Sequence, residues 1–537
     1  MKLLAKIISV AMALSVSVGI FAGCGQKSID TENYLEVYVW DAGYGTAWLD
    51  AQLEDFISQD WVQEKYPDCD YGLRFNDDNS FAAGRIAQGS TNTIDLFFAG
   101  DMQGTFESYA YDLTEVLYEQ QVPGEDILYK DKMIDTMYDA MAHHSDTGEV
   151  RYYSTSYMFG MISYIYNVTL FEDLGLTVPN TTGELVELCE KVKGMEGKNP
   201  AYPYKHTIIS SKIAYSNRLF DLFWAQYDGT DGVSNYFNAI APDGTRNSVD
   251  IFKEKGREVS ARVYENLYKE SLGYFDRSSI TYEFMAGQTR MLTGEGLIMS
   301  CGEWFSNEMA ELAEAYVERG YDYEIGMMRP PIVSEIIDKT PSIKNNGGDK
   351  KLSEVIDDID AGRTAPTDPA VTQEDFDLIR KARGVMVCPD AINATAVVAK
   401  DATARDMAVD FLLYQATDRA NSIYAENTSG GMQAFKFVLK DDDPELYEKM
   451  MNESRNTFRM QADASEITHG DNTEIVYGYY PLVEYGNFTA IESTGLESLF
   501  MSDESATAAD IIAEHDNYWL ENNAKRFHNA LQRAGLE

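Results

Sequence analysis

Residues 35–40 read Leu35-Glu36-Val37-Tyr38-Val39-Trp40, and their alternating side chains predict a β-strand. The turn Asp41-Ala42-Gly43-Tyr44-Gly45 follows, and then a helical stretch whose apolar face consists of Trp48, Leu49, Leu53, Phe56 and Ile57. Further along we expect a strand at 71–76, a helix from Ser80 and a strand at 94–98. Strands that alternate with helices predict an α/β fold with a largely parallel sheet, whose ligand site lies beyond the carboxyl ends of the strands.

A second set of elements begins near Tyr152, where an aromatic-rich strand is expected to run to Asn167. The helix after Pro179 has a well-marked start, because Thr181 and Glu184 have the spacing of a capping box. Its core-facing stripe consists of Leu185, Leu188, Cys189 and Val192. A strand at 394–398 and a helix at 402–413 are expected later, and the acidic region at about 332–383 is predicted to be a surface insertion with one helix at 373–381.

Composition narrows the class of protein. The 537 residues include 44 Lys and Arg against 88 Asp and Glu, for a net charge of −44. At roughly 100–200 residues per domain, this length suggests two to four domains. Hydrophobic residues make up 44% of the chain and charged residues 25%, which is typical of globular proteins. So negative a charge is repelled by phosphate and by anionic lipid, so we expect no nucleic-acid partner.

The N-terminus predicts export. Lys2 and Lys6 precede the apolar run at 7–21, which is too short to span a bilayer comfortably and ends in small residues before Cys24. We interpret residues 1–23 as a signal peptide whose end resembles a bacterial lipobox, with Cys24 as the lipidated residue and 24–33 as a polar tether. A plain cleaved signal with an incidental cysteine is the alternative.

Four further cysteines, at positions 69, 189, 301 and 388, are too scattered for a disulfide framework or a zinc site. The last three lie among apolar neighbours, which predicts buried free thiols.

Several segments carry a family resemblance. The run at 166–179, Tyr-Asn-Val-Thr-Leu-Phe-Glu-Asp-Leu-Gly-Leu-Thr-Val-Pro, resembles the YN-x-x-LF-x-x-x-GL-x-x-P segment of bacterial extracellular solute-binding proteins of family 1, the ABC-transporter carbohydrate-binding lipoproteins of maltose-binding type. Residues 294–304, Gly-Glu-Gly-Leu-Ile-Met-Ser-Cys-Gly-Glu-Trp, resemble the family's GEAAM-x-x-xG-x-W segment. Residues 323–331 resemble its later IG-x-x-x-xP strand, and 402–413 its A-x-x-FL helix.

The resemblance implies a two-lobed periplasmic-binding-protein-like fold of class II, with a hinge between the lobes. It places lobe one at 34–155 plus 325–425, with the insertion at about 332–383, and lobe two at 156–324 plus 426–537. It also implies capture of a mono- or oligosaccharide in an interlobe cleft and delivery to ABC permease subunits. We therefore expect a monomer that is lipid-anchored at the outer face of the cytoplasmic membrane.

Sugars stack on aromatic rings and pair with carboxylates and amides, so the candidate ligand-binding residues are of these types. Trp304 matches the family's sugar-stacking Trp, and Asp101 its hydroxyl-binding Asp; a core Trp and a helix cap are the alternatives. Gly160 stands where some oligosaccharide binders place a Glu, which removes one hydroxyl acceptor. The remaining candidates are Trp40, Asp41, Tyr44, Tyr157, Trp224 and Glu303.

No catalytic, nucleotide-binding or metal-binding motif is complete in the sequence, so we expect no enzyme, no cofactor and no metal ion. Acidic pairs are too frequent for counting to exclude a glycosidase. A secreted glycoside hydrolase or polysaccharide lyase therefore stays as an alternative, as do a binder of a non-sugar solute such as a peptide and a surface adhesin.

Overall fold

The structure is a computed structural model that describes residues 31–41, 43–78, 80–100, 102–144, 149–193, 195, 206–211, 215–388, 394–453, 474–476, 495–533 and 536. The predicted signal peptide at 1–23, the lipidation residue Cys24 and the candidate Asp101 lie outside the described residues. Of the predicted tether at 24–33, only 31–33 are described.

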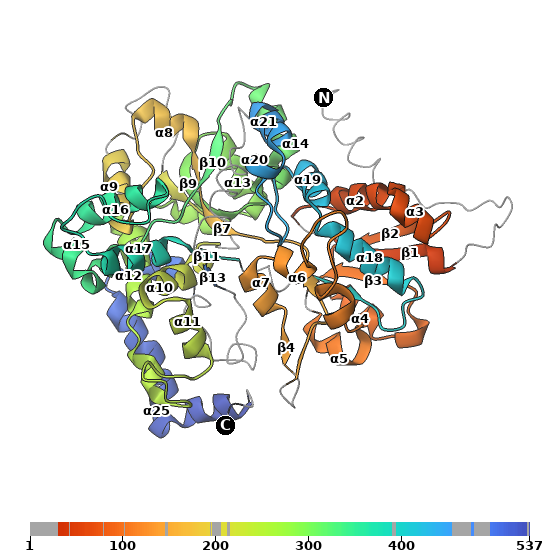
Figure 1. Ribbon diagram of the computed structural model, residues 1–537. Coiled ribbons are helices and arrows are strands. Elements are labelled where there is room, and N and C mark those ends of the chain that lie inside the picture. The colour runs from red at the N-terminus through yellow and green to blue at the C-terminus, as the bar shows by residue number, and fades with distance from the viewer. Residues whose placement is uncertain are drawn as a thin grey trace.

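Two lobes, each with its own sheet and helices, lie side by side (Figure 1). The sheet of lobe one has the order β2-β1-β3-β12-β6. Its strands are β1 (Tyr34–Trp40), β2 (Asp70–Asn76), β3 (Leu96–Ala99), β6 (Thr155–Ser156) and β12 (Thr395–Val398). β1 runs parallel to β2 and β3, whereas β12 is antiparallel to β3 and β6. The predicted α/β class is thus confirmed, but the sheet is mixed rather than largely parallel, because β12 runs against both of its neighbours.

Helices cover both faces of this sheet, as the alternation along β1 requires. Leu35, Val37 and Val39 point into a core shared with α2 (Ala47–Ser58) and α18 (Arg405–Gln415). Tyr38, on the other face, packs with α4 (Phe81–Ile86) and α5 (Phe106–Tyr109). The remaining helices of lobe one are α3 (Asp60–Lys65), α6 (Tyr129–Lys132), α7 (Asp135–Ala140), α19 (Asp418–Asn427), α20 (Leu439–Asp442) and α21 (Pro444–Glu453), and a small hairpin joins β4 (His143–His144) to β5 (Val150–Arg151).

The sheet of lobe two has the order β13-β11-β7-β9-β8, and β10 also pairs with β7. Its strands are β7 (Ile162–Asn167), β8 (His206–Ile209), β9 (Gly296–Gly302), β10 (Ile325–Met328), β11 (Val385–Val387) and β13 (Glu474–Val476). Its helices are α8 (Val168–Leu174), α9 (Thr182–Lys193), α10 (Leu219–Asp228), α11 (Thr230–Phe237), α12 (Gly256–Tyr268), α13 (Phe284–Leu292), α14 (Phe305–Val317), α15 (Pro341–Asn345), α16 (Asp349–Asp360), α17 (Gln373–Arg383), α24 (Leu496–Ser502) and α25 (Ala508–Arg533).

The chain passes between the lobes at 157–161, between β11 and β12, and between α21 and β13. The expected strand at 152–167 is therefore two strands, β6 and β7, which belong to different sheets. The segment between them is held to lobe one, since the backbone N–H of Phe159 donates to the carbonyl of Met432 at 3.0 Å. Such crossing segments are where a hinge between the lobes has to lie.

Strand pairing favours lobe boundaries that differ from those the resemblance implied. Residues 325–425 were expected in lobe one, yet β10 and β11 are both antiparallel to β7 in the sheet of lobe two. Residues after 426 were expected in lobe two, yet α20 and α21 pack on α19 through a cluster that contains Ala425, Leu439 and Leu446. We therefore propose that the chain returns from lobe two to lobe one at β12 and stays in lobe one until the end of α21.

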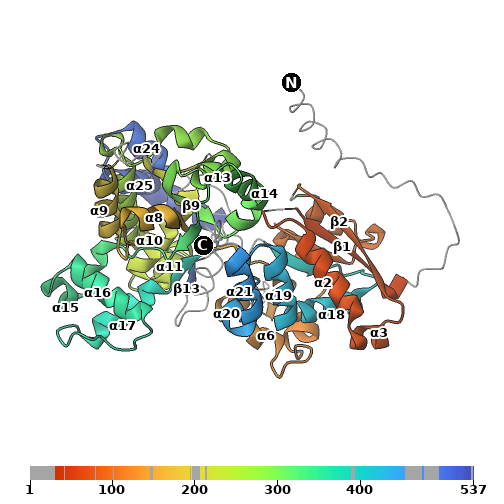
Figure 2. The ribbon, with the colours of Figure 1, turned by 90° about the horizontal axis from the view of Figure 1, so that it is seen from above.

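The region at 332–383 contains more helix than expected. α17 confirms the predicted helix at 373–381, but α15 and α16 are present as well. α16 buries Leu352, Val355 and Ile356, an i, i+3, i+4 stripe that holds it to its neighbours. In Figure 2 the three helices form the outer end of lobe two, on the side away from lobe one.

Two finer predictions are confirmed. Thr181 Oγ1 accepts the backbone N–H of Glu184 at 3.1 Å, so the predicted cap is present. The reciprocal bond of the capping box differs, because the Glu184 side chain accepts from the N–H of Asn180 and not from that of Thr181. The cysteines at 69, 189, 301 and 388 are all buried free thiols. Within the described ranges, no helix is both long and apolar enough to cross a membrane.

Candidate ligand-binding site

Two turns from different lobes meet at the interface. The turn after β1, at 41–46, belongs to lobe one, and the turn from Gly302 into α14 belongs to lobe two. Asn307 Nδ2 donates to the carbonyl of Gly43 at 2.8 Å, and Tyr44 Oη donates to Glu303 Oε1 at 2.5 Å. Both turns follow the carboxyl ends of strands, which is where α/β sheets place ligand sites.

Trp304 lies at the centre of this meeting. Its side chain is 6% exposed, and the rings of Tyr44 and Tyr215 pack edge-on against it at 6.5 and 5.5 Å between centroids. Gly302 lets the indole fold back, because a Cβ there would come within 2.3 Å of the ring. Gly43 lets lobe one approach, since its Cβ would lie 3.2 Å from Trp304 Cγ. Trp304 lies in the turn between β9 and α14.

Glu303 reaches from lobe two into lobe one. Its carboxyl is buried, and Oε1 accepts from Tyr44 and from the backbone N–H of Gly160 at 3.3 Å. Within the described part of the chain, Oε2 has no hydrogen-bond partner. Burial raises the pKa of Glu303 to about 7, although the hydrogen bonds from Tyr44 and Gly160 oppose the rise. A carboxyl therefore lies beside Gly160, where the sequence had predicted the loss of one.

An aromatic cluster continues from Tyr44 into lobe one. The ring of Tyr424 lies 6.0 Å from that of Tyr44 and 5.0 Å from that of Trp48. Tyr157 stacks on Trp48 at 5.7 Å and is 4% exposed. The predicted residues Tyr44, Tyr157, Glu303 and Trp304 are thus brought together, with Tyr157 on the side of the lobe-one core.

The other described candidates lie elsewhere. Trp40 is half-buried on the same face of β1 as Tyr38, and its Nε1 donates to the carbonyl of Asp77 at 3.3 Å. Asp41 is exposed at the edge of the turn, and partial burial together with the charge of Asp77 raises its pKa. Trp224 is 1% exposed within lobe two, where it packs on Tyr236 at 5.1 Å. That position makes Trp224 a core residue, and we do not retain it in the site.

Sequence reasoning missed Tyr215, Asn307 and Glu308. Glu308 Oε1 would lie 3.1 Å from a Cβ on Gly43, so its carboxyl faces the lobe-one turn. Burial raises its pKa to about 7, and Gln288 Nε2, which donates to it at 2.6 Å, opposes the rise. The sequence position of Asn307 and Glu308 could have indicated them, because both lie in the first turn of the helix that follows Trp304 and therefore at the same end of the sheet.

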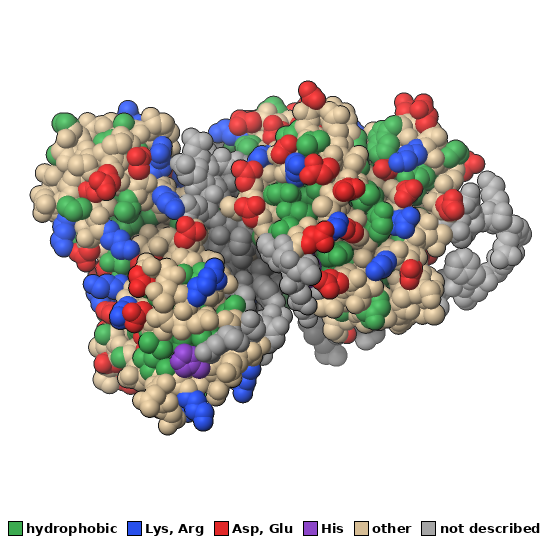
Figure 3. Space-filling view, turned by 60° about the horizontal axis from the view of Figure 1, so that its bottom comes forward, with side chains coloured by type: hydrophobic (Ala, Val, Ile, Leu, Met, Phe, Trp, Pro, Cys, Tyr) green, Lys and Arg blue, Asp and Glu red, His purple; other side chains and the backbone are tan. Residues whose placement is uncertain are grey.

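In the space-filling view the two lobes form separate halves, and on the face drawn Asp and Glu are interspersed with Lys and Arg over both (Figure 3). Within the described ranges, no group of three His, Cys, Asp or Glu side chains could hold a metal ion.

Comparison with solved structures gives whole-length matches. RafE of Streptococcus pneumoniae, in its apo form, matches with a TM-score of 0.54 at 13% identity, covering 94% of this chain and 100% of RafE. The chain has the fold of a solute-binding protein. RafE in complex with raffinose matches with a TM-score of 0.51 at 13% identity, covering 92% of this chain and 99% of RafE. Lmo0181 of Listeria monocytogenes is an ABC substrate-binding protein in complex with cycloalternan. It matches with a TM-score of 0.52 at 14% identity, covering 94% of this chain and 99% of Lmo0181.

A probable secreted solute-binding lipoprotein from Streptomyces coelicolor matches at 0.51 and 12%, covering 91% of this chain and 98% of that one. These neighbours are binding proteins rather than enzymes. No protein-family model and no curated protein matches the sequence.

Proposed function

We propose that this protein is the extracellular, lipid-anchored solute-binding component of an ABC importer, and that it captures a mono- or oligosaccharide between its lobes. The proposal rests above all on the meeting of Glu303 and Trp304 of lobe two with Tyr44 of lobe one. These side chains supply an aromatic ring and a carboxyl acceptor, the two kinds of group that bind a sugar face and its hydroxyls. The matches to RafE and to Lmo0181 support the same class of ligand.

Capture works through lobe closure. Tyr44, Glu303 and Trp304 pack on one another between the lobes, so a sugar enters when the lobes separate. The sugar then stacks on the indole ring and donates hydrogen bonds to the carboxyl oxygens. It shifts the equilibrium toward the closed form by the difference between its binding free energies for the closed and open forms. The permease subunits recognise the closed form and accept the sugar chemically unchanged.

A thermal-shift screen of the purified full-length chain against a panel of glycans tests the function. A sugar that binds the folded form raises the midpoint of unfolding by mass action, by an amount that grows with its concentration. Chromatography of the same mixtures distinguishes a binder from a glycoside hydrolase or a lyase, because a binder leaves the sugar intact. If no glycan shifts the midpoint, or if the sugar is consumed, the proposed function is wrong.

The anchor has a separate test. Cys24→Ala removes the thiol that the lipid modifies, so we expect the variant to appear in the soluble fraction while the wild type stays with the membrane. Cys69→Ser is the matched control, since that cysteine is buried in lobe one and should not change the distribution. A Cys24→Ala variant that stays membrane-bound would exclude lipidation at this position.

A further inference from the structure

Among the described residues, the carboxyls of Glu303 and Glu308 at the lobe interface have no basic partner. Asp516 and Asp360, by contrast, pair with Arg257 and Arg383 at 2.7 Å each. The buried Glu497 resembles the interface pair, because hydroxyl groups donate to it. Glu303 accepts from the Tyr44 hydroxyl and from backbone N–H groups, and Glu308 accepts from the Gln288 amide. Within the described residues neither carboxyl has a Lys, Arg or His partner.

The same place has too few hydrogen-bond donors. Glu303 is 3% exposed, and its Oε2 has no donor among the described residues. Gln288 is fully buried beside Glu308, and its Oε1 also has no donor there. Buried acceptors without donors are costly, so a group that brings several N–H donors would be bound strongly.

Aromatic rings surround these acceptors. Tyr44 and Tyr215 pack against Trp304, which is the residue next to Glu303. The face of a Trp or Tyr ring attracts a cation, and a buried carboxylate without a counter-charge does so much more strongly. The high pKa of Glu303 and of Glu308, about 7 in each case, has the same origin, because burial without a cation disfavours the charged form.

We infer that the captured ligand is an amino sugar, whose protonated amine pairs with Glu303 while its ring stacks on Trp304. This inference rests on the proposed function and specifies its substrate class. An ammonium group brings three N–H donors and the missing positive charge. The net charge of −44 draws cations toward the molecule and repels anionic sugars.

Matched pairs of sugars test the inference on the purified full-length chain by calorimetry at pH 6.5. The pairs are glucosamine with glucose, galactosamine with galactose, and the β-1,4-linked disaccharide of glucosamine with cellobiose. In each pair only the C2 group changes, from ammonium to hydroxyl. We expect an amino member to bind at least tenfold more tightly than its neutral counterpart. Equal or tighter binding of the neutral member in every pair that binds overturns the inference.

Variants assign the preference to a residue. Glu303→Gln should reduce the ratio of amino-sugar to neutral-sugar affinity to below threefold, whereas Glu335→Gln should keep that ratio. Glu335 is the matched control, since it is half-buried with a raised pKa but lies in the helical region at 332–383. A Glu303→Gln variant that retains the ratio contradicts the inference. If Glu303→Gln fails to fold, the wild-type ratio and Glu308→Gln still decide it.

Spermidine, an amine without a sugar ring, helps to distinguish a failure of the amino-sugar inference from a failure of the proposed sugar-binding function. If neutral sugars bind as well as amino sugars, only the inference fails. If no sugar of either kind binds, the proposed function fails with it, and binding of spermidine alone identifies the site as one for polyamines.

Discussion

Glu303 illustrates at the scale of one residue how burial sets a titration. Its carboxyl accepts hydrogen bonds from the Tyr44 hydroxyl and the Gly160 N–H of lobe one, and the side chain of Tyr424 also lies near the carboxyl. The pKa is raised from 4.5 to about 7, so the fold favours the neutral form. The stabilisation is therefore complete below about pH 4.5 and is lost as the pH rises through about 7.

Glu303→Gln, which keeps a neutral side chain of the same size, should show this pH dependence by difference. At pH 4.5 we expect the variant to unfold at the same temperature as the wild type. At pH 8 the variant should be more stable, by a free energy of unfolding on the order of 3 kcal/mol. Thermal unfolding across this pH range checks the prediction, and a constant difference between the two proteins would contradict it.

Trp304→Ala should weaken sugar binding by about 1.5–3 kcal/mol if the ring is covered by the ligand. This corresponds to a roughly 10- to 150-fold rise in Kd, measured by calorimetry with a glycan from the screen. Trp519→Ala is the matched control, because Trp519 is 5% exposed, close to the 6% of Trp304, but lies in α25. The control should lower the melting temperature without changing affinity. A folded Trp304→Ala variant with wild-type affinity would remove Trp304 from the site.

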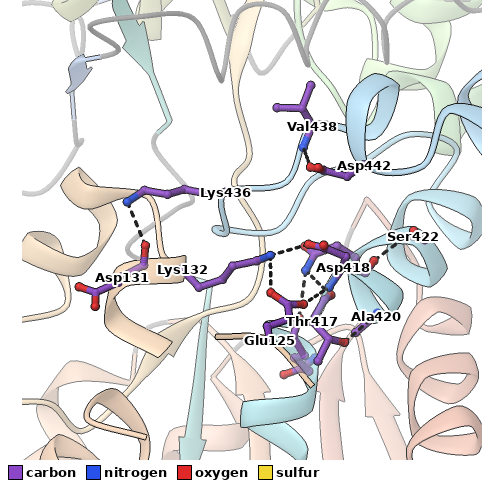
Figure 4. Close-up of polar contacts among 12 residues, drawn as sticks. Glu125, Asp131, Lys132, Thr417, Asp418, Ala420, Ser422, Lys436, Val438 and Asp442 are labelled. Carbon is purple, nitrogen blue, oxygen red and sulfur yellow. Dashed lines mark hydrogen bonds and ion pairs between the residues drawn. The ribbon is translucent and has the colours of Figure 1, made fainter. Parts of the chain in front are cut away.

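At the scale of elements, α19 is fastened to the rest of lobe one by Lys132. This side chain is 8% exposed and contacts Glu125 at 2.7 Å and Asp418, at the start of α19 (Figure 4). Burial alone lowers the pKa of Lys132, yet the hydrogen bonds to Asp418 and Glu125 raise it overall. Thr417 caps the same helix by accepting the N–H of Ala420 at 3.1 Å.

Lys132→Met should destabilise lobe one by about 1–3 kcal/mol, since it leaves two carboxylates without their shared cation. Hydrogen exchange should then accelerate at the amides of α19. The comparison is Lys436→Met, which breaks an exposed pair with Asp135 at 2.6 Å and should cost under about 1 kcal/mol. Equal effects of the two substitutions would mean that the Lys132 network does not hold α19.

Element prediction from the sequence succeeded where periodicity was local and failed where a strand was divided. The stripe on α9 and its N-terminal cap lie within one helix, so the sequence contains all that is needed. The division of 152–167 into β6 and β7 is set by their pairing with β12 and β9, which lie more than a hundred residues away. Gly160, with a φ of 69°, marks the break locally, but it does not indicate which sheet each half joins.

At the scale of the whole molecule, direct contacts join the two lobes. Tyr44 and Gly43 of lobe one bind Glu303 and Asn307 of lobe two. Such contacts shift the balance between open and closed forms even before a ligand binds.

Tyr44→Phe removes the hydroxyl that donates to Glu303 but keeps the ring. We expect a loss of about 0.5–1.5 kcal/mol of closed-state stability, hence a roughly 2- to 10-fold shift toward the open form. Small-angle scattering should show a larger radius of gyration without ligand. Tyr71→Phe is the control, because Tyr71 bonds Asp50 within lobe one at 2.7 Å. An unchanged radius in Tyr44→Phe would show that this bond does not hold the lobes.

The sequence alone predicted the α/β class and most of the elements, since these depend on local periodicity. It also predicted three of the side chains that meet at the interface, Tyr44, Glu303 and Trp304. The tertiary structure determined the division of the chain between the lobes, the place of Trp224 in a core and the approach of Glu308 to Gly43. These features depend on which strands, distant in the sequence, pair with one another and on which side chains are buried against one another. Both are determined only when the chain has folded.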